Sequence, residues 1–146
     1  MSKMSRTKGA VAEREVFKIF NDELGLEIRR NLDQYQQSDS DARMYGFCIE
    51  IKRCEKLNLR AWWNQVVEAS KKDDSVPILI YRQSRQPWRV MMPMAATSPI
   101  FDPTANWLCD FEWTQTVLLE PAFMYVLRET ISSQHIEMMT NKEVHH

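Results

Sequence analysis

Glu50 and Lys52 alternate with the apolar residues Ile49 and Ile51 in the segment GFCIEIKRCE, which spans residues 46–55. Side chains two positions apart in a β-strand share one face, so both are expected to project together, opposite the apolar side chains between them. A carboxylate can bind a divalent cation, and an ammonium group can stabilise negative charge that develops on a phosphate. The alternative is a solvent-exposed strand face that carries an ordinary ion pair.

A second carboxylate, Glu13, falls within a predicted helical stripe. At about 100° per residue, Glu13 aligns with apolar residues, whereas Glu15 falls on the opposite face of the helix. The aligned residues are Ala10, Phe17, Phe20 and Leu24. An ionised carboxylate in a core-facing stripe is costly unless it is paired or coordinates a cation. Glu13 is therefore a candidate metal ligand, or part of a buried salt bridge to Lys52 or to Arg14 of another copy.

The segment SDSDA supplies a third carboxylate shortly before the strand that holds Glu50. Asp41 is the preferred candidate and Asp39 competes for the same role, although aspartates in serine-rich segments are often only turn formers. Glu13, Asp41 and Glu50 would offer three oxygen ligands beside Lys52. Mg²⁺ prefers few carboxylates together with water and phosphate oxygens, and Mn²⁺ is expected to substitute. The chemistry that this group favours is metal-dependent cleavage of a phosphodiester.

The hydrophobic pattern predicts which elements must position these residues. Residues 6–25 and 59–74 are predicted helices, and a further helix is predicted to begin at Pro121. Strands are predicted over 26–32, 42–53, 76–83, 86–93 and 109–119, and irregular segments over 33–41 and 94–106. This order predicts one α/β domain, a mixed central β-sheet flanked by helices. Its core would span 6–92, followed by a C-terminal extension over 93–134 and a flexible tail over 135–146.

Two motifs resemble known nucleases. Asp41 followed by Glu50-Ile51-Lys52 is similar to the PD-(D/E)XK nuclease signature, and KGAVAERE (8–15) resembles the opening of archaeal and phage Holliday-junction resolvases. The resemblance spans about residues 6–92 and implies a restriction-endonuclease-like fold. It implies that Glu13 is a metal-site residue and that Arg29 or Arg30 matches the arginine before the polar loop. It also implies that Gln65 supports Lys52 or the attacking water.

Basic residues flank the predicted site, as expected for a polyanionic substrate. The candidates for neutralising DNA phosphates are Arg6, Lys8, Arg29, Arg30, Arg53, Lys56 and Arg60. The alternative for any one of them is ordinary surface solubility. Residues 1–90 carry 17 Lys and Arg against 13 Asp and Glu, whereas residues 91–146 carry 2 against 7. A chance variation of charge along the chain is the competing explanation. The basic character of residues 1–90 is nevertheless compatible with DNA bound on one side of the protein.

These observations predict a Mg²⁺-dependent, structure-selective endonuclease, in particular a phage Holliday-junction resolvase acting on branched double-stranded DNA. Paired nicks in a four-way junction require two symmetric active sites, so a homodimer is expected. The alternatives are another nuclease of the superfamily (a nickase or a restriction-like enzyme), a catalytically inactive DNA-binding module, and a host-interaction protein. Three cysteines without paired spacing favour a reducing cytoplasm, and the resemblance to phage enzymes implies that this is the cytoplasm of a bacterial host. No apolar run reaches the length of a membrane span.

Overall fold

The computed structural model describes the backbone of residues 3–25, 42–98 and 106–144, and the side chains of 9–25, 42–98 and 107–134. The helices are α1 (Lys3–Leu24), α2 (Leu59–Ser70) and α3 (Met124–Val144). The strands are β1 (Ala42–Met44), β2 (Phe47–Cys54), β3 (Val76–Gln83), β4 (Arg89–Pro93) and β5 (Thr114–Leu118). Three 3-10 turns, η1 to η3, and the π-turn η4 (Leu119–Phe123) complete the order.

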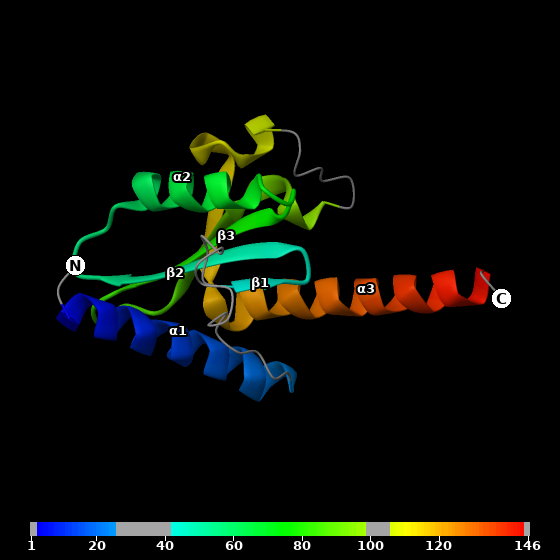
Figure 1. Ribbon diagram of the computed structural model, residues 1–146, viewed down its shortest axis with the longest axis horizontal. Helices are drawn as coiled ribbons and strands as arrows, with labels where there is room; N and C mark the ends of the chain where they lie inside the picture. The colour runs from blue at the N-terminus through cyan, green and yellow to red at the C-terminus, as the bar shows by residue number, and fades with distance from the viewer. Residues whose placement is uncertain (1–2, 26–41, 99–105, 145–146) are drawn as a thin grey trace.

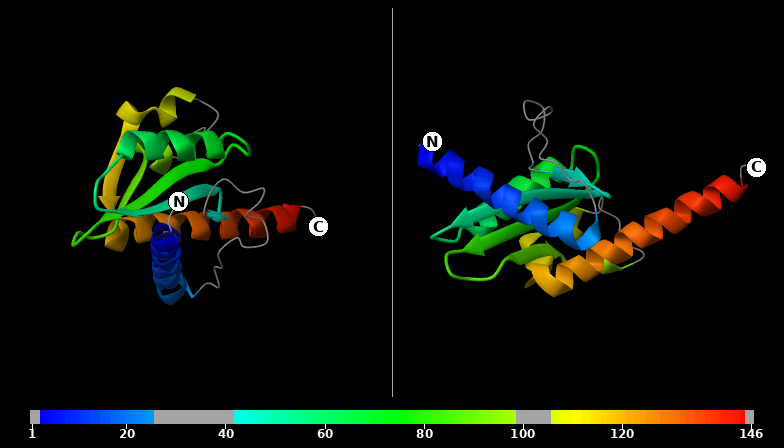
Figure 2. Two further views of the ribbon diagram at one scale, coloured as in Figure 1. Left: turned by 60° about the vertical axis from the view of Figure 1, so that its left-hand side comes forward. Right: turned by 90° about the horizontal axis from the view of Figure 1, so that it is seen from below.

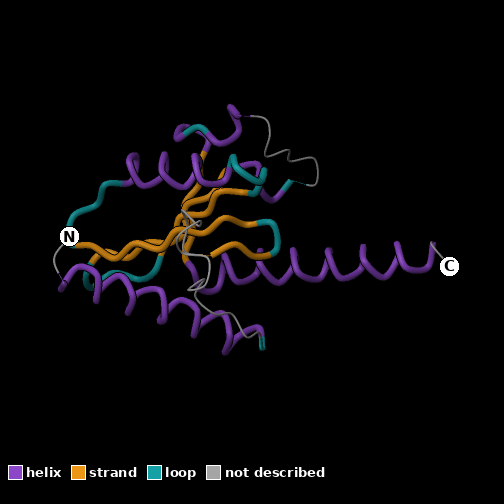
Figure 3. Tube along the Cα trace, viewed as in Figure 1, coloured by secondary structure: helices purple, strands orange, loops and turns teal. Residues whose placement is uncertain are grey.

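The five strands form one mixed sheet in the order β1-β2-β3-β4-β5. Strands β2 and β3 are parallel, and the other neighbouring pairs are antiparallel. Helix α2 covers one face of the sheet, and α1 and α3 cover the other (Figures 1 and 3). The predicted α/β fold with a mixed central sheet is therefore confirmed, with three helices packed against the sheet.

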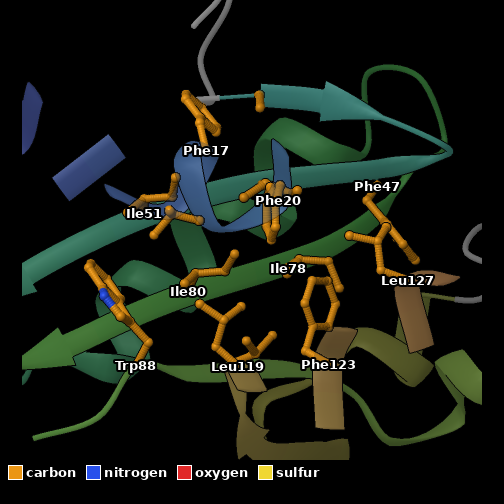
Figure 4. Packing of buried hydrophobic residues seen from close by; sticks show 14 of the residues in the cluster. Phe17, Phe20, Phe47, Ile51, Ile78, Ile80, Trp88, Leu119, Phe123 and Leu127 are labelled. Atoms are coloured by element: carbon orange, nitrogen blue, oxygen red, sulfur yellow. The ribbon is translucent and has the colours of Figure 1, made fainter. Parts of the chain in front are cut away.

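Each face of the sheet has its own hydrophobic cluster. On one face, side chains from α1, α3 and the strands pack together (Figure 4), among them Phe17, Phe20, Ile51, Ile80 and Phe123. On the other face, the buried side chains come from α2 and the alternate strand positions. They include Cys48, Trp63, Val66, Leu79 and Met91. A central strand buried on both faces explains why residues 76–81 form a continuous apolar run.

The region predicted as one strand over 42–53 is instead a hairpin of β1 and β2, so this prediction was wrong. The loop contains only Tyr45 and Gly46, and Met44 pairs directly with Phe47. Both loop residues have positive φ, 51° and 83°, which is the geometry of a type I′ turn. Glycine is usual at such a position but tyrosine is not, and for this reason the sequence concealed the turn.

The ends of the helices differ in how well the sequence predicted them. Helix α1 stops at Gly25, as predicted, where φ is +66° and the amide donates to the Asn21 carbonyl at 2.9 Å. Helix α2 ends at Ser70, before the predicted Asp74, because Ser75 N–H returns to the Ser70 carbonyl at 3.1 Å. The predicted strand over 26–32 and loop over 33–41 lie outside the described residues.

The C-terminal extension takes part in the sheet and in the core. Strand β5 pairs with the edge of β4, and the helix predicted from Pro121 begins at Met124, after η4. Phe123 and Leu127 are fully buried against the α1 face of the sheet. The backbone of α3 continues to Val144 and extends beyond the sheet (Figures 1 and 2), and the flexibility expected for residues 135–146 stays a prediction.

Candidate active site

Glu50 and Lys52 lie side by side on β2, on the face that α2 covers. The Lys52 Nζ atom is 3.4 Å from Oε1 of Glu50, and their side chains are 28% and 9% exposed. Their register partners on β3 are Tyr81 and Leu79, which belong to the buried cluster beneath α2. Burial of Glu50 contradicts the exposed ion pair that the sequence left open. Such a carboxylate costs several kcal/mol of desolvation, which nearby charges must offset.

Glu13 is also buried, at 6% exposure, as its place in the apolar stripe predicted. Its neighbours on α1, Ala12, Val16 and Phe17, belong to the core on the opposite face of the sheet from α2. Glu13 is one helical turn before Phe17, and Figure 4 shows Phe17 beside Ile51 on the β1 side of this cluster. The two buried carboxylates therefore come from helix and strand on opposite faces of β2.

The contacts of Glu15 define the rotation of α1. Glu15 Oε1 accepts hydrogen bonds from Nη1 of Arg82 at 3.0 Å and from Nε1 of Trp88 at 3.1 Å. Arg82 lies on β3 and Trp88 just before β4, so this flank of α1 faces the β3–β4 side of the sheet. Glu13 is about 200° away around the helix axis. Its flank therefore faces the β1–β2 side. Sequence reasoning assigned no role to Glu15, since its partners are remote in the chain.

Within the described residues, the pairing of β1 with β2 stops just before Glu50. The pairing of β1 with β2 ends at Ala42 and Ile49, so β1 does not cover the part of β2 that carries Glu50 and Lys52. Glu13 lies on the α1 face and Glu50 on the α2 face of this part of the sheet. The predicted third carboxylate, Asp41 or Asp39, lies outside the described residues. Within the described ranges, no cluster of three His, Cys, Asp or Glu side chains is arranged to hold a metal ion.

Helix α2 presents Gln65 and Arg60 in different directions. Gln65 is exposed and lies one turn before Ala69, whose carbonyl accepts from Nη2 of Arg43 on β1 at 2.8 Å. This flank of α2 therefore faces β1 and β2. The Arg60 guanidinium instead lies 4.3 Å from the centre of the Phe111 ring and 3.5 Å from Glu112. The structure does not bring Arg60 to the Glu50 side of the helix.

The other predicted phosphate-binding residues are only partly described. Arg53 and Lys56 are exposed directly after the site residues of β2. Arg6 and Lys8 lie in the first turns of α1, where the structure describes the backbone but not the side chains. Arg29 and Arg30 lie outside the described residues.

The mixed sheet between helices is compatible with the predicted nuclease fold, and its first helix and second strand each carry a buried glutamate. Residues 4–108 match the model of a protein family described as "Phage putative PDDEXK endonuclease". The chain belongs to this family. It is therefore a phage-type endonuclease of the PD-(D/E)XK superfamily by family, and DNA is the substrate class that this membership implies. No curated protein matches the chain.

The residues of this endonuclease suit the metal that its superfamily typically uses. Nucleases with this signature typically require a divalent cation. Glu13 and Glu50 are hard oxygen donors in a nearly water-free setting, which is the donor chemistry that Mg²⁺ and Mn²⁺ favour. None of the described helices combines the length and apolarity that a membrane span requires.

Proposed function

We propose that this chain is a Mg²⁺-dependent, structure-selective endonuclease, a phage Holliday-junction resolvase that makes paired nicks in four-way DNA junctions. The observation that carries the proposal is the burial of Glu13 on α1 and of Glu50 on β2, with Lys52 3.4 Å from Glu50. Family membership supports the nuclease chemistry, and the resemblance of KGAVAERE to resolvase openings supports the junction substrate.

Glu13 and Glu50 are the residues that would hold the cation, with Asp41 as the proposed third ligand. Asp41 precedes Ala42 in the sequence, and Ala42 pairs with Ile49, the residue before Glu50. A divalent cation in such a site polarises a phosphoryl oxygen and lowers the pKa of the attacking water. Mn²⁺ would serve in place of Mg²⁺, since both accept carboxylate and water oxygens.

Lys52 and Gln65 take the positioning roles in this proposal. The Lys52 ammonium donates hydrogen bonds toward the scissile phosphate and stabilises the charge that develops on its oxygens. Glu50 holds this ammonium on the inner side through their 3.4 Å contact. Gln65, on the flank of α2 that faces β1 and β2, supports Lys52 or orients the attacking water. Arg53 and Lys56 continue the same strand and would bind flanking phosphates.

A resolvase needs two such sites, because both strands of a junction are cut symmetrically. A two-fold homodimer satisfies this requirement, and the long α3 helix in the C-terminal extension is the proposed interface. Light scattering should then give twice the 17.3 kDa mass of the chain. A monomer that nicks one strand only would favour the nickase alternative.

The test compares a synthetic four-way junction, a flap and a linear duplex, each incubated with Mg²⁺ and the full chain. We expect paired nicks in the junction and little cleavage of the linear duplex. A Glu50→Ala variant should bind the junction without cutting it, and a Lys18→Ala variant, altered on the solvent side of α1, should cut as the parent does. Equal cleavage of all three substrates would exclude junction selectivity, and cleavage by the Glu50 variant at the parental rate would exclude the site.

A further inference from the structure

The β3–β4 hairpin carries arginines that the nuclease motifs do not include, and it lies beside the end of β2, which carries the motif residue Lys52. Segments 52–59 and 82–89 together hold six Lys and Arg, three in each, and a single acid, Glu55. Strands β2 and β3 are parallel, so both segments begin at the same end of the sheet, with Arg53 paired to Arg82. The first turns of α1 lie at this end as well, and the C-terminal end of α3 lies at the other (Figure 1).

Hydrogen bonds fix the hairpin on both sides. On one side, Arg82 and Trp88 donate to Glu15 of α1 at 3.0 and 3.1 Å. On the other side, Ser84 Oγ donates to Oε1 of Glu55 at 2.7 Å, and Gln83 Nε2 donates to the Glu55 carbonyl at 3.0 Å. The one acid of the two segments is thus engaged by the hairpin itself. A fixed arm of this kind loses little conformational freedom when it binds a ligand.

Arg85 occupies the tip of this arm in a conformation that does not suit arginine. Its φ is 66°, and the turn is closed by Gln86 N–H, which donates to the Gln83 carbonyl at 2.9 Å. The second central residue of such a turn is normally glycine or asparagine. Arg85 is exposed, so burial does not explain the choice. An unfavourable residue at an exposed tip points to a use for its side chain.

The position of Arg85 relative to the proposed site favours a phosphate near the scissile one. Gln83 pairs with Cys54, two residues after Lys52, and Arg85 follows Gln83 by two residues. At about 3.3 Å per strand residue, the tip lies on the order of 10 Å beyond Lys52. An arginine side chain at that distance reaches a backbone phosphate one or two nucleotides away from the bond that is cut.

We propose that the β3–β4 hairpin is a DNA-binding arm and that Arg85 binds a backbone phosphate flanking the scissile bond. The proposal rests on the endonuclease function proposed above and identifies the surface along which the duplex lies. The proposed contact is to a phosphate rather than to a base, since Arg85 stands among other cations at the tip of the hairpin.

The test is an Arg85→Gly variant of the full chain, because glycine removes the guanidinium and suits the positive φ. Binding to labelled duplex is measured by fluorescence anisotropy in EDTA over a series of NaCl concentrations. We expect about five- to tenfold weaker binding near 0.1 M NaCl, with the slope of log K against log [NaCl] reduced by about one. The midpoint of thermal unfolding should stay equal or rise.

Two control variants isolate the effect. Asp74→Gly also places glycine at a left-handed position, φ 54°, and Lys18→Ala removes an exposed cation on α1. Both should bind DNA as the parent does. The loss in Arg85→Gly should be the same on two unrelated duplex sequences, since phosphates carry no base information.

Several outcomes would overturn the proposal. Parental affinity and salt slope in Arg85→Gly would exclude the contact, and a loss confined to one DNA sequence would exclude a phosphate as its target. A parent that binds no DNA would also exclude it. Cleavage of DNA by the parent in Mg²⁺ is measured in parallel. If the parent cuts while Arg85→Gly binds normally, the arm fails and the endonuclease function stands. If the parent binds DNA through Arg85 but never cuts it, the DNA-binding arm stands and the endonuclease function fails.

Discussion

Glu50 is an acid in a strand whose neighbouring positions Cys48, Ile49 and Ile51 are buried. The sequence predicted that Glu50 shares a strand face with Lys52, because successive side chains of a strand alternate between its two faces. The sequence did not predict that Glu50 is buried, since a strand face that carries two charges is more often exposed. The burial of Glu13, in contrast, was predicted from the helical stripe alone. What the sequence lacked was the covering of the Glu50 face by α2, which depends on contacts between remote segments.

Replacing Glu50 with glutamine should separate stability from activity. The amide has nearly the same shape but no charge, so the variant avoids the desolvation of a buried carboxylate. In EDTA, the free energy of unfolding of Glu50→Gln should therefore equal that of the parent or exceed it by about 1 kcal/mol. Cleavage in Mg²⁺ should fall by about a hundredfold or more. Urea denaturation and a nicking assay measure the two effects. A clearly less stable variant would indicate that the Glu50–Lys52 pair serves the fold.

At the level of elements, the sequence predicted α1 and its stop at Gly25, and it predicted β3 with its observed limits, 76–83. Helical stripes and continuous apolar runs are local signals, so these elements were accessible. The β1–β2 hairpin was missed because its turn uses Tyr45 rather than asparagine or glycine. The attachment of α1 to the β3–β4 hairpin through Glu15 was missed because no local pattern encodes a partner 67 or 73 residues away.

Removing the Glu15 side chain should loosen α1 and reduce activity through Glu13. In Glu15→Ala, the indole N–H of Trp88 and the guanidinium of Arg82 lose their acceptor, which should cost about 1–2 kcal/mol of unfolding free energy. Cleavage should fall several-fold because the helix that carries Glu13 is no longer fixed. Urea denaturation and turnover on saturating DNA measure both effects. Asp22→Ala, which removes an exposed ion pair of the same helix, should change neither by more than about 0.5 kcal/mol. Parental stability in Glu15→Ala would refute the role.

The attachment of β1 to the end of α2 should depend on pH through Asp73. Partial burial raises the pKa of Asp73, but the Ser75 hydroxyl and the Arg43 guanidinium, 2.6 Å away, outweigh it, so the pKa lies below its usual value of 3.8. A lowered folded-state pKa adds stability that is present above the unfolded-state pKa and is lost as the pH falls through the folded-state value.

Asp73→Asn should therefore be less stable than the parent at neutral pH, with the difference vanishing at pH values below the folded-state pKa of Asp73. The Asp73 side chain is 48% exposed, so the difference should be only about 0.5 kcal/mol. Urea denaturation at a series of pH values from 7 down to below 3.8 measures it. A difference that persists unchanged at the acidic end of the series would assign the stabilisation to something other than the Asp73 charge.

Over the whole molecule, the basic and acidic segments lie at different ends of the structure. The cations of 52–59 and 82–89 gather where the parallel strands end, whereas the acidic extension, with its long α3 helix, runs to the opposite end (Figure 1). This arrangement would favour DNA at the end of the sheet that carries these cations. The sequence predicted the asymmetry from counts alone. It did not predict that the extension fills the core, because its apolar residues lie among polar ones and only their contact with α1 shows their role.

The extension should be as necessary for folding as the nuclease core. Leu127 on α3 is fully buried, so Leu127→Ala should lower the free energy of unfolding by about 3 kcal/mol. Tyr125, on the same helix, is 64% exposed, and Tyr125→Ala should change the free energy by less than about 0.5 kcal/mol. Chemical denaturation of both variants provides the comparison. A Leu127 variant of parental stability would mean that the extension folds independently of the sheet.

The central claim, that carboxylates from α1 and from β2 share one cation, is tested most directly by titrating Mn²⁺ into the full chain by calorimetry. The parent, Glu13→Gln and Glu50→Gln are compared under the same conditions, with Lys18→Ala as the control. We predict saturable binding by the parent and the control, and at least tenfold weaker binding by each glutamine variant. Parental Mn²⁺ affinity in Glu13→Gln would show that the helix carboxylate does not belong to the site.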